Sequence, residues 1–337
     1  MKLVCAMLLG FVLDLIFGDP HGLVHPVQII GWIIDKLKKG MQYLIYGCSY
    51  EEVKEKGIER KAGMEKAAGF FLMLFIVAGT YAVIYGILYV AGMIHPLLRF
   101  CLETFFIYQI LATKSLKKES MKVYKKLKEG DLLGARKEVS YLVGRDTENL
   151  DESEVAKADV ETIAENTADG VIAPMLFIAL GGAPLGFAYK AVNTLDSMVA
   201  YRNDELIHIG FFSAKMDDIC NFVPARFAAV MMMLAAFFLR FDFKGAVRIF
   251  KRDRFAHLSP NSAQTEAVAA GALQIQLGGT HNYFGKAVVK PTIGDAIRPV
   301  EYEDIKRTNQ LLYVSAFLSM AVCTLITFLI YVQLFNV

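Results

Sequence analysis

The sequence has few of the features that mark metal-binding or nucleic-acid-binding proteins. Its five cysteines are widely spaced and include no C-x-x-C pair, which argues against a structural zinc site or a disulfide framework. The formal net charge is only +2 over 337 residues, so the chain lacks the basic surplus that phosphate backbones attract. We therefore expect most of the cysteines to be packed core thiols, and we expect no nucleic-acid partner.

A nucleotide-binding P-loop is also missing. The segment "GTHNYFGKA", which begins at Gly279, resembles one, but five residues separate its two glycines where the motif requires four. Ala287 also stands where the motif has the serine or threonine that binds magnesium. The six histidines are scattered, and for His25, which precedes Pro26, we expect a structural hydrogen bond.

The chain is instead rich in apolar residues. Hydrophobic residues make up 55% of the sequence and the mean hydropathy is +0.40, yet 21% of residues are charged. This mixture indicates a membrane protein with substantial polar regions between its membrane segments. The predicted fold class is therefore mainly α, a polytopic α-helical membrane protein with about four to six membrane segments and a cytoplasmic helical portion.

Several apolar runs approach the length that a membrane-spanning helix needs. Leu3–Phe17 is followed by "GDPHGLVHP" in place of a small-residue cleavage site, so we expect a retained first helix rather than a signal peptide. The other candidate spans are Phe70–Val90, the short Leu97–Ala112, Asn221–Phe241 and Leu311–Phe335.

Two lysine-rich segments, Asp35–Lys66 and Lys114–Lys137, constrain the topology. The positive-inside rule places both in the cytoplasm. Two crossings, Phe70–Val90 and Leu97–Ala112, joined by a tight turn at "GMIHPLLR", satisfy this requirement. The polar segment that follows predicts two helices broken at Gly130-Asp131, and then a helix over Glu154–Ala168 that Asp151 or Ser153 caps.

Acidic and amide side chains gather at the start of the next apolar run. Glu161, Glu165 and Asp169 are four residues apart, so they share one helical face, which is either a solvated surface or a cation site. Asn166-Thr-Ala-Asp169 recurs as Asn193-Thr-Leu-Asp196, and the apolar stretch between the copies is broken by Gly181-Gly182-Ala183-Pro184. The break predicts a re-entrant hairpin that returns both motifs to one side of the membrane. We predict that Glu165, Asp169 and Asp196 hold Mg²⁺.

Further polar residues in this region suit binding of phosphate or substrate, with ordinary loop and cap chemistry as the alternative. The predicted binding residues are Asn166, Asn193, Arg202, Asn203, Lys215, Asp217, Arg226, Ser259, Asn261, Gly278, Gly279 and Asp295. Arg226 lies within an apolar run, so it should pair with a carboxylate such as Asp217 or Asp218 or contact substrate.

The predicted domain ranges are 1–112 for N-terminal membrane helices with a Lys-rich cytoplasmic loop, 113–160 for a cytoplasmic helical region, 161–310 for a catalytic region with membrane-embedded segments, and 311–337 for a C-terminal transmembrane helix.

Over nearly its whole length the chain resembles the adenosylcobinamide-phosphate synthases of cobalamin biosynthesis, which are polytopic membrane proteins. The segments that carry the resemblance are "DLIFGDPHGLVHPVQIIG", the long run from "LVGRDTENL" to "NTLDSMVAYRN", "DDICNFVPARF", "SPNSAQTEAVAAGALQIQLGG" and "PTIGD". Several long motifs in the same order make a specific signal.

The resemblance implies a ligase reaction. ATP and Mg²⁺ would activate the free propionate of adenosylcobyric acid, through an acyl phosphate, for amide formation with aminopropanol or aminopropanol phosphate. ATP and the corrinoid are then substrates rather than bound cofactors. From the chemistry we expect Glu165 and Asp218 to act as catalytic carboxylates. The resemblance also implies a multi-pass protein of the cytoplasmic membrane, with its active site facing the cytoplasm and other late cobalamin-pathway membrane enzymes as partners.

Two other functions remain open from the sequence. A corrinoid transporter would also use broken helices and intramembrane charges, but it should show repeated halves, and only the short N-T-x-D echo repeats here. A non-catalytic membrane signalling relative should lack these dense polar motifs. Turnover by the purified protein separates the three hypotheses.

Overall fold

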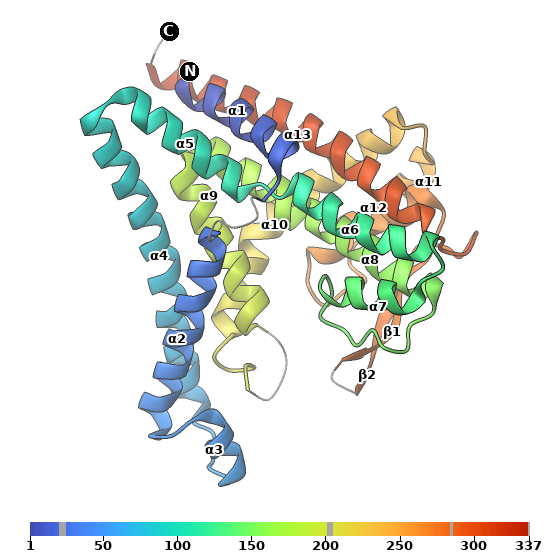
Figure 1. The fold of residues 1–337 in the computed structure, drawn as a ribbon, viewed down its shortest axis with the longest axis horizontal. Coiled ribbons are helices and arrows are strands. Elements are labelled where there is room, and N and C mark those ends of the chain that lie inside the picture. The colour runs from blue at the N-terminus through green and yellow to red at the C-terminus, as the bar shows by residue number, and fades with distance from the viewer. Residues whose placement is uncertain (20–24, 201–204, 284–285, 336–337) are drawn as a thin grey trace. The chain divides into compact units, whose positions relative to one another are not determined.

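The computed structural model describes residues 1–19, 25–200, 205–283 and 286–335, which are almost entirely helical (Figure 1). The predicted class, a polytopic helical membrane protein, is confirmed. The elements are α1 (Lys2–Phe17), α2 (Pro26–Tyr46), α3 (Tyr50–Glu55), α4 (Ala62–Ile94), α5 (Pro96–Ile110), α6 (Thr113–Lys128), α7 (Leu132–Ser140), α8 (Glu152–Asn166), the π-helical turn η1 (Thr167–Ile172), α9 (Ala173–Val199), α10 (Phe211–Phe238), α11 (Phe243–Asp253), α12 (Ser262–Leu273), β1 (Leu277–Tyr283), β2 (Lys286–Ile293) and α13 (Glu303–Phe335).

Four of the described helices are long and apolar enough to cross a membrane. These candidate spans are Ala62–Ile94, Phe211–Phe238, Glu303–Gln333 and, as one continuous run of α8, η1 and α9, Glu152–Val199. The expected segments Leu3–Phe17 and Leu97–Ala112 form α1 and α5, which have 16 and 15 residues and fall short of the roughly 20 residues of a full span.

The chain folds as two compact units. Unit 1 contains Met1–Gly10, Pro20–Ile110 and Leu176–Cys220, and unit 2 contains Phe11–Asp19, Leu111–Met175 and Asn221–Val337. Both units are therefore built from segments that are far apart in the sequence.

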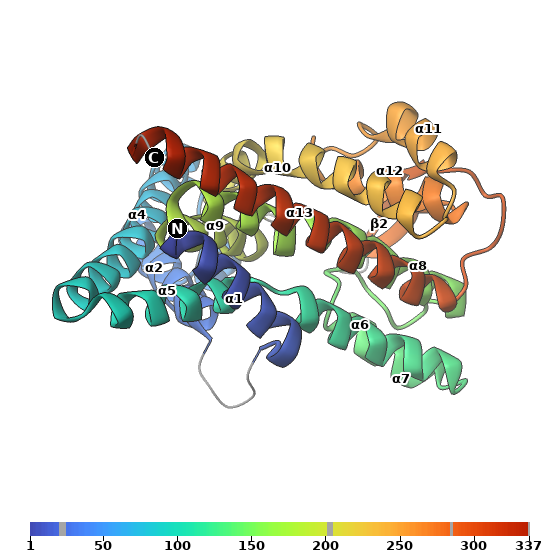
Figure 2. The same ribbon diagram turned by 90° about the horizontal axis from the view of Figure 1, so that it is seen from above.

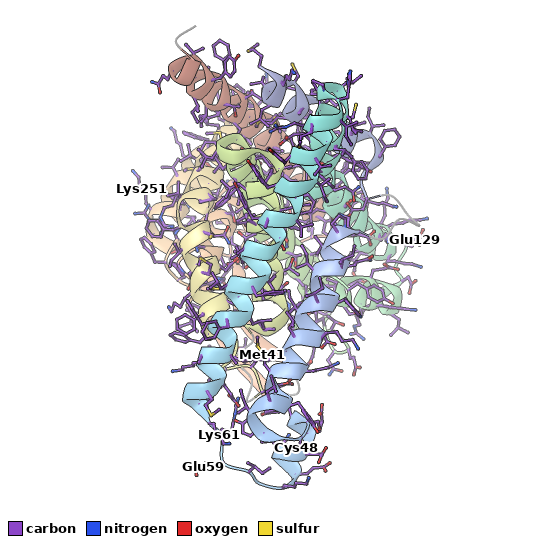
Figure 3. All side chains as sticks on the ribbon, turned by 90° about the vertical axis from the view of Figure 1, so that its left-hand side faces the viewer. Met41, Cys48, Glu59, Lys61, Glu129 and Lys251 are labelled. Atoms are coloured by element: carbon purple, nitrogen blue, oxygen red, sulfur yellow. The ribbon has the colours of Figure 1, made fainter. Side chains whose placement is uncertain are left out.

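The core of unit 1 lies where α2 and α4 pack along each other. Figure 3 shows the two helices side by side, with Met41 on α2 and with Cys48 beyond the end of α2, near α3. Ile34 and Leu72 are fully buried in this contact. His25 caps α2, because its Nδ1 accepts a hydrogen bond from the Val27 N–H at 3.2 Å, so its expected structural role is confirmed. The expected turn between two apolar helices falls at His95, which separates α4 from α5.

Helix α9 is a hairpin of two half-helices. Gly181 and Gly182 leave the helical conformation, and Gly182 has a φ of +67° that favours glycine. The rings of Phe177 and Tyr189 then stack with centroids 4.7 Å apart, which a straight helix could not allow over twelve residues. The fold-back predicted from "GGAP" is thus present.

Unit 2 surrounds α8. Helix α13 packs along both α6 and α8, and the arrangement can be followed in Figure 2. The predicted break at Gly130-Asp131 separates α6 from α7, and Asp131 caps α7 through the Gly134 N–H at 2.8 Å. Asp151, one of the two residues expected to cap this helix, caps α8 in a capping box with Glu154. Strands β1 and β2 form an antiparallel hairpin, which the sequence did not lead us to expect.

Candidate active site

A polar cavity of about 140 Å³ lies inside unit 2. Its walls come from four separate stretches of chain: the loop before α8, one face of α8, the entry to α12 together with α12 itself, and the β-hairpin. The ionisable side chains that line it are Arg145, Glu161, Glu165, His257, Glu266 and Lys290. A cavity in which several ionisable groups converge is the default candidate for an active site.

Helix α8 supplies two of the carboxylates. Glu161 and Glu165 are one turn apart and line the cavity together, while Val160, Ile163 and Ala164 bury the opposite face. The spacing predicted Asp169 on the same face. However, the helix widens into the π-turn after Asn166, which shifts the register, and Asp169 is half-buried outside the set of residues that line the cavity.

An ion pair closes one wall. Arg145 Nη2 donates to Glu161 Oε2 at 2.7 Å, and the Gly278 N–H donates to Glu161 Oε1 at 2.7 Å. Arg145 is buried and Glu161 is largely buried, so the pair needs these hydrogen bonds to offset the cost of desolvation. Glu161 therefore joins α8 to the preceding loop and to β1.

His257 and Glu266 form the opposite wall. The His257 Nδ1 lies 3.5 Å from Glu266 Oε1 and 3.1 Å from Ser262 Oγ. The other ring nitrogen, Nε2, is buried and has no hydrogen-bond partner among the described residues. A substrate group in the cavity could therefore bind it.

Burial sets the protonation of this pair. Desolvation and the Lys290 charge lower the pKa of His257, so the imidazole is neutral at pH 7. Burial, with the negative charges of Glu165 and Glu161, raises the pKa of Glu266 well above its ordinary value. A neutral imidazole oriented by a carboxyl group is the arrangement that general-base catalysis uses.

The predicted site residues divide into four groups. Glu165, Asn166 and Gly278 line the cavity. Gly279 follows Gly278 in β1, and a Cβ added there would lie 3.7 Å from Lys157 Nζ. Unit 1 contains Asn193, Asp196, Lys215, Asp217 and Asp218, on α9 and α10, where Lys215 Nζ lies 3.9 Å from Asp218 Oδ2. Arg202 and Asn203 fall outside the described residues.

The remaining four predicted residues lie elsewhere in unit 2. Arg226 donates to the Phe222 carbonyl at 2.6 Å and to Asn261 Oδ1 at 3.3 Å, so the groups it contacts are neutral. Ser259 Oγ accepts from the Asn261 N–H at 3.3 Å, whereas the Asn261 side chain does not cap α12. Asp295 pairs with Arg252 at 2.7 Å and with Arg248 at 3.2 Å.

Four of the ionisable side chains that line the cavity were not predicted: Arg145, His257, Glu266 and Lys290. A signal did exist for Glu266, which is the single charged residue of the segment "SAQTEAVAAGAL". An isolated carboxylate within small and apolar residues has to be buried with a partner or with a ligand.

Comparison with known proteins identifies the family. The family model described as CobD/Cbib protein matches residues 7–312. The chain belongs to the CobD/CbiB family. It is 48% identical over 320 residues to cobalamin biosynthesis protein CobD of Clostridium perfringens, covering 95% of this chain and 96% of that protein. It is 42% identical over 319 residues to cobalamin biosynthesis protein CbiB of Salmonella choleraesuis, with coverage of 95% and 96%. No solved structure matches the chain. A role in cobalamin biosynthesis follows from this membership.

Proposed function

We propose that this CobD/CbiB protein is an ATP-dependent acid–amine ligase. It would join the propionate of adenosylcobyric acid to aminopropanol or aminopropanol phosphate, giving adenosylcobinamide or its phosphate. The observation that carries the proposal is the cavity in unit 2, which combines a buried neutral imidazole with carboxylates and cations. The cytoplasmic membrane, with the cavity open to cytoplasmic ATP, is the location that this reaction requires.

The reaction proceeds in two balanced steps. A propionate oxygen attacks the γ-phosphorus of ATP, forming an acyl phosphate and releasing ADP. The amine nitrogen then attacks the acyl carbon, the carbon–oxygen bond to phosphate breaks, and inorganic phosphate leaves. The ammonium loses its protons on the way to the amide, so the second step needs a base.

His257 is the base in this proposal. Its Nε2 is free of described partners, and its lowered pKa keeps it ready to accept a proton at neutral pH. Nε2 accepts a proton in the tautomer in which Nδ1 carries the ring hydrogen and donates it to Ser262 Oγ or to the unprotonated oxygen of the Glu266 carboxyl group. Arg145 and Lys290 provide positive charge for the phosphate that is transferred and released.

The cavity's oxygen donors suit Mg²⁺ by chemical type, and Glu165 is the predicted ligand that lines it. Within the described residues no three His, Cys, Asp or Glu side chains form a ready-made metal cluster. Mg²⁺ bound with nucleotide needs only one or two carboxylates, because phosphate oxygens and water complete its shell. When bound, the ion would screen the charge on the phosphates. Asp169 and Asp196 stay predicted ligands.

A turnover assay with purified protein tests the proposal. Adenosylcobyric acid, aminopropanol phosphate, ATP and Mg²⁺ should give the amide and ADP in equal amounts, measured by mass spectrometry. Loss of the general base in His257→Gln should lower kcat by about 10²-fold or more. The matched control is His208→Gln in unit 1, which should keep normal kcat. No product from the wild-type protein, or an unchanged kcat in His257→Gln, would contradict the function or the assigned base respectively.

A further inference from the structure

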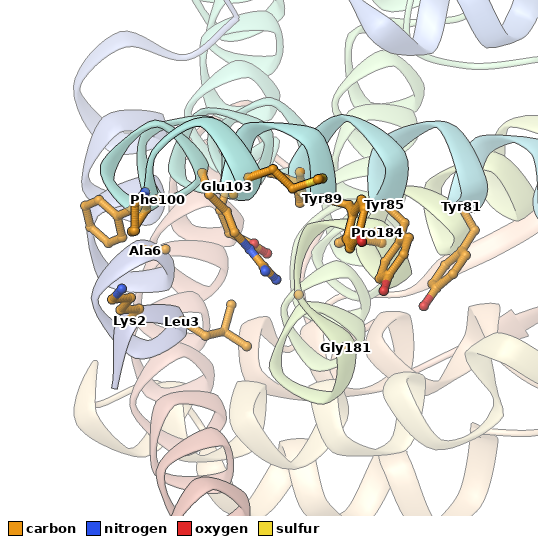
Figure 4. A pocket seen from close by; sticks show the side chains of 16 residues that line it. Lys2, Leu3, Ala6, Tyr81, Tyr85, Tyr89, Phe100, Glu103, Gly181 and Pro184 are labelled. Atoms are coloured by element: carbon orange, nitrogen blue, oxygen red, sulfur yellow. The ribbon is translucent and has the colours of Figure 1, made fainter.

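A second and larger cavity, of about 660 Å³, lies within unit 1 (Figure 4). Residues at the start of α1, the C-terminal half of α4, the following helix α5 and the tip of the α9 hairpin line it. Its volume is in the ~300–1,000 Å³ range of small-molecule sites. None of the residues assigned to the reaction lines it.

One wall is aromatic. Tyr81, Tyr85 and Tyr89 recur every four residues on α4 and stack with centroids 6.0 and 6.3 Å apart. Figure 4 shows Tyr81 and Tyr85 side by side on this wall. The rings are about half exposed on a helix long and apolar enough to span a membrane. A flat wall of amphipathic rings suits the glycerol and upper acyl region of a lipid.

A hydrogen bond joins α5 to the tip of the α9 hairpin in the cavity lining. Glu103 Oε1 accepts a hydrogen bond from the Ala183 N–H at 2.9 Å and so caps the second half-helix of α9. A Cβ added at Gly182 would lie only 2.5 Å from the same oxygen. The Glu103 carboxylate is therefore held at the tip of the α9 hairpin by this hydrogen bond.

Two cationic side chains also line the cavity. Lys2 and Arg99 line it, and neither side chain makes a hydrogen bond or ion pair with any residue that the structure describes. Gly92 leaves room for the arginine, because an added Cβ there would lie 3.2 Å from Arg99 Cδ. Arg99 interacts electrostatically with Glu103, and Lys2 is the second cation of the lining. Positive side chains therefore outnumber negative ones in the lining, and the cavity favours an anion.

We propose that this cavity binds an anionic phospholipid, with its phosphate between Arg99 and Lys2 and its acyl chains along the tyrosines of α4. Charge complementarity selects the headgroup, and the apolar, membrane-level wall selects the chains. The site is independent of the ligase reaction.

Native mass spectrometry of the detergent-purified chain tests this site. The probes are phosphatidylglycerol and phosphatidylcholine with identical acyl chains, titrated separately and in competition. Wild-type protein should prefer phosphatidylglycerol by at least tenfold in apparent Kd. Combining Lys2→Gln with Arg99→Gln should remove the preference, whereas Arg99→Lys alone should retain most of it because a cation remains.

Arg240→Gln is the matched control, since it removes an exposed arginine that does not line the cavity. It should leave the preference unchanged. An equal affinity for both lipids in wild type, or a full preference in the double variant, overturns the proposal. Displacement of bound phosphatidylglycerol by cobyric acid would overturn it as well, because the cavity would then belong to the corrinoid. A melting curve confirms that each variant is folded.

Discussion

Glu266 shows how much one buried side chain controls in the candidate site. It is 3% exposed, within 3.5 Å of His257, and near two other glutamates. Burial and those negative charges favour its protonated form in the folded protein. The unfolded chain has no such environment, so protonation of this group couples the stability of the fold to pH.

Glu266→Gln should therefore stabilise the protein in alkaline solution. The folded state holds its proton above the ordinary glutamate pKa, so it binds more protons than the unfolded state. The stability contributed by this group is then fully present at acid pH and is lost as the pH rises toward the folded pKa. Melting temperatures of wild type and variant, measured in detergent from pH 5 to 9, should diverge with rising pH in favour of the variant.

Glu152→Gln is the control for this experiment, because it removes an exposed glutamate from the start of α8. Its pH profile should be parallel to that of the wild type. A Glu266→Gln protein that melts progressively below wild type as the pH rises would show that the carboxyl is not protonated in the folded state.

At this scale, the sequence predicts those site residues that are close together in the chain. Glu165 and Asn166 were recognised because they are neighbours within one motif. Arg145, His257 and Lys290 join them only through folding, from segments up to more than a hundred residues away. Helical periodicity carries no information about such contacts.

At the scale of elements, breaks in the chain were the most predictable features. Gly182, followed by Pro184, marks the hairpin of α9, and Gly130 marks the turn between α6 and α7. Both glycines have a positive φ, which few other residues adopt. The π-turn after α8 has no such marker in the sequence. The prediction therefore continued the i, i+4 spacing through this turn and placed Asp169 on the same face as Glu165. The two strands were also not predicted from the sequence.

Gly182 is the clearest test of the hairpin. Gly182→Ala places a Cβ at φ +67° and 2.5 Å from Glu103 Oε1, so it should destabilise the protein by about 1–3 kcal/mol. Gly79→Ala in the middle of α4 is the control, because an added Cβ there meets nothing within 4 Å, and it should be neutral or slightly stabilising. Equal melting temperatures for the two variants would show that the hairpin tip tolerates a side chain.

At the scale of the whole molecule, the distribution of lysine predicts how the chain is oriented in the membrane. The lysine-rich segments Asp35–Lys66 and Lys114–Lys137 lie on either side of the α4–α5 turn at His95. The positive-inside rule still predicts that both face the cytoplasm, which requires the 15-residue α5 to return the chain across the membrane after α4.

Cysteine labelling in intact cells checks this topology. On a background without the five natural cysteines, Lys54→Cys and Lys125→Cys should both be protected from an impermeant maleimide and react after permeabilisation. His95→Cys should react from outside. Labelling of only one lysine position in intact cells would refute a shared side.

Unit 2 starts with a piece of the first helix and is completed by the last. Phe11 meets Phe317 with ring centroids 5.3 Å apart, and Asp14 accepts a hydrogen bond from the Thr113 N–H at 3.0 Å, within the same unit. A ribosome that makes the chain from its N-terminus therefore has to release nearly all of it before this unit can close. Until then, α8 lacks the helix that covers it, and the nascent protein depends on the insertion machinery to shield that surface.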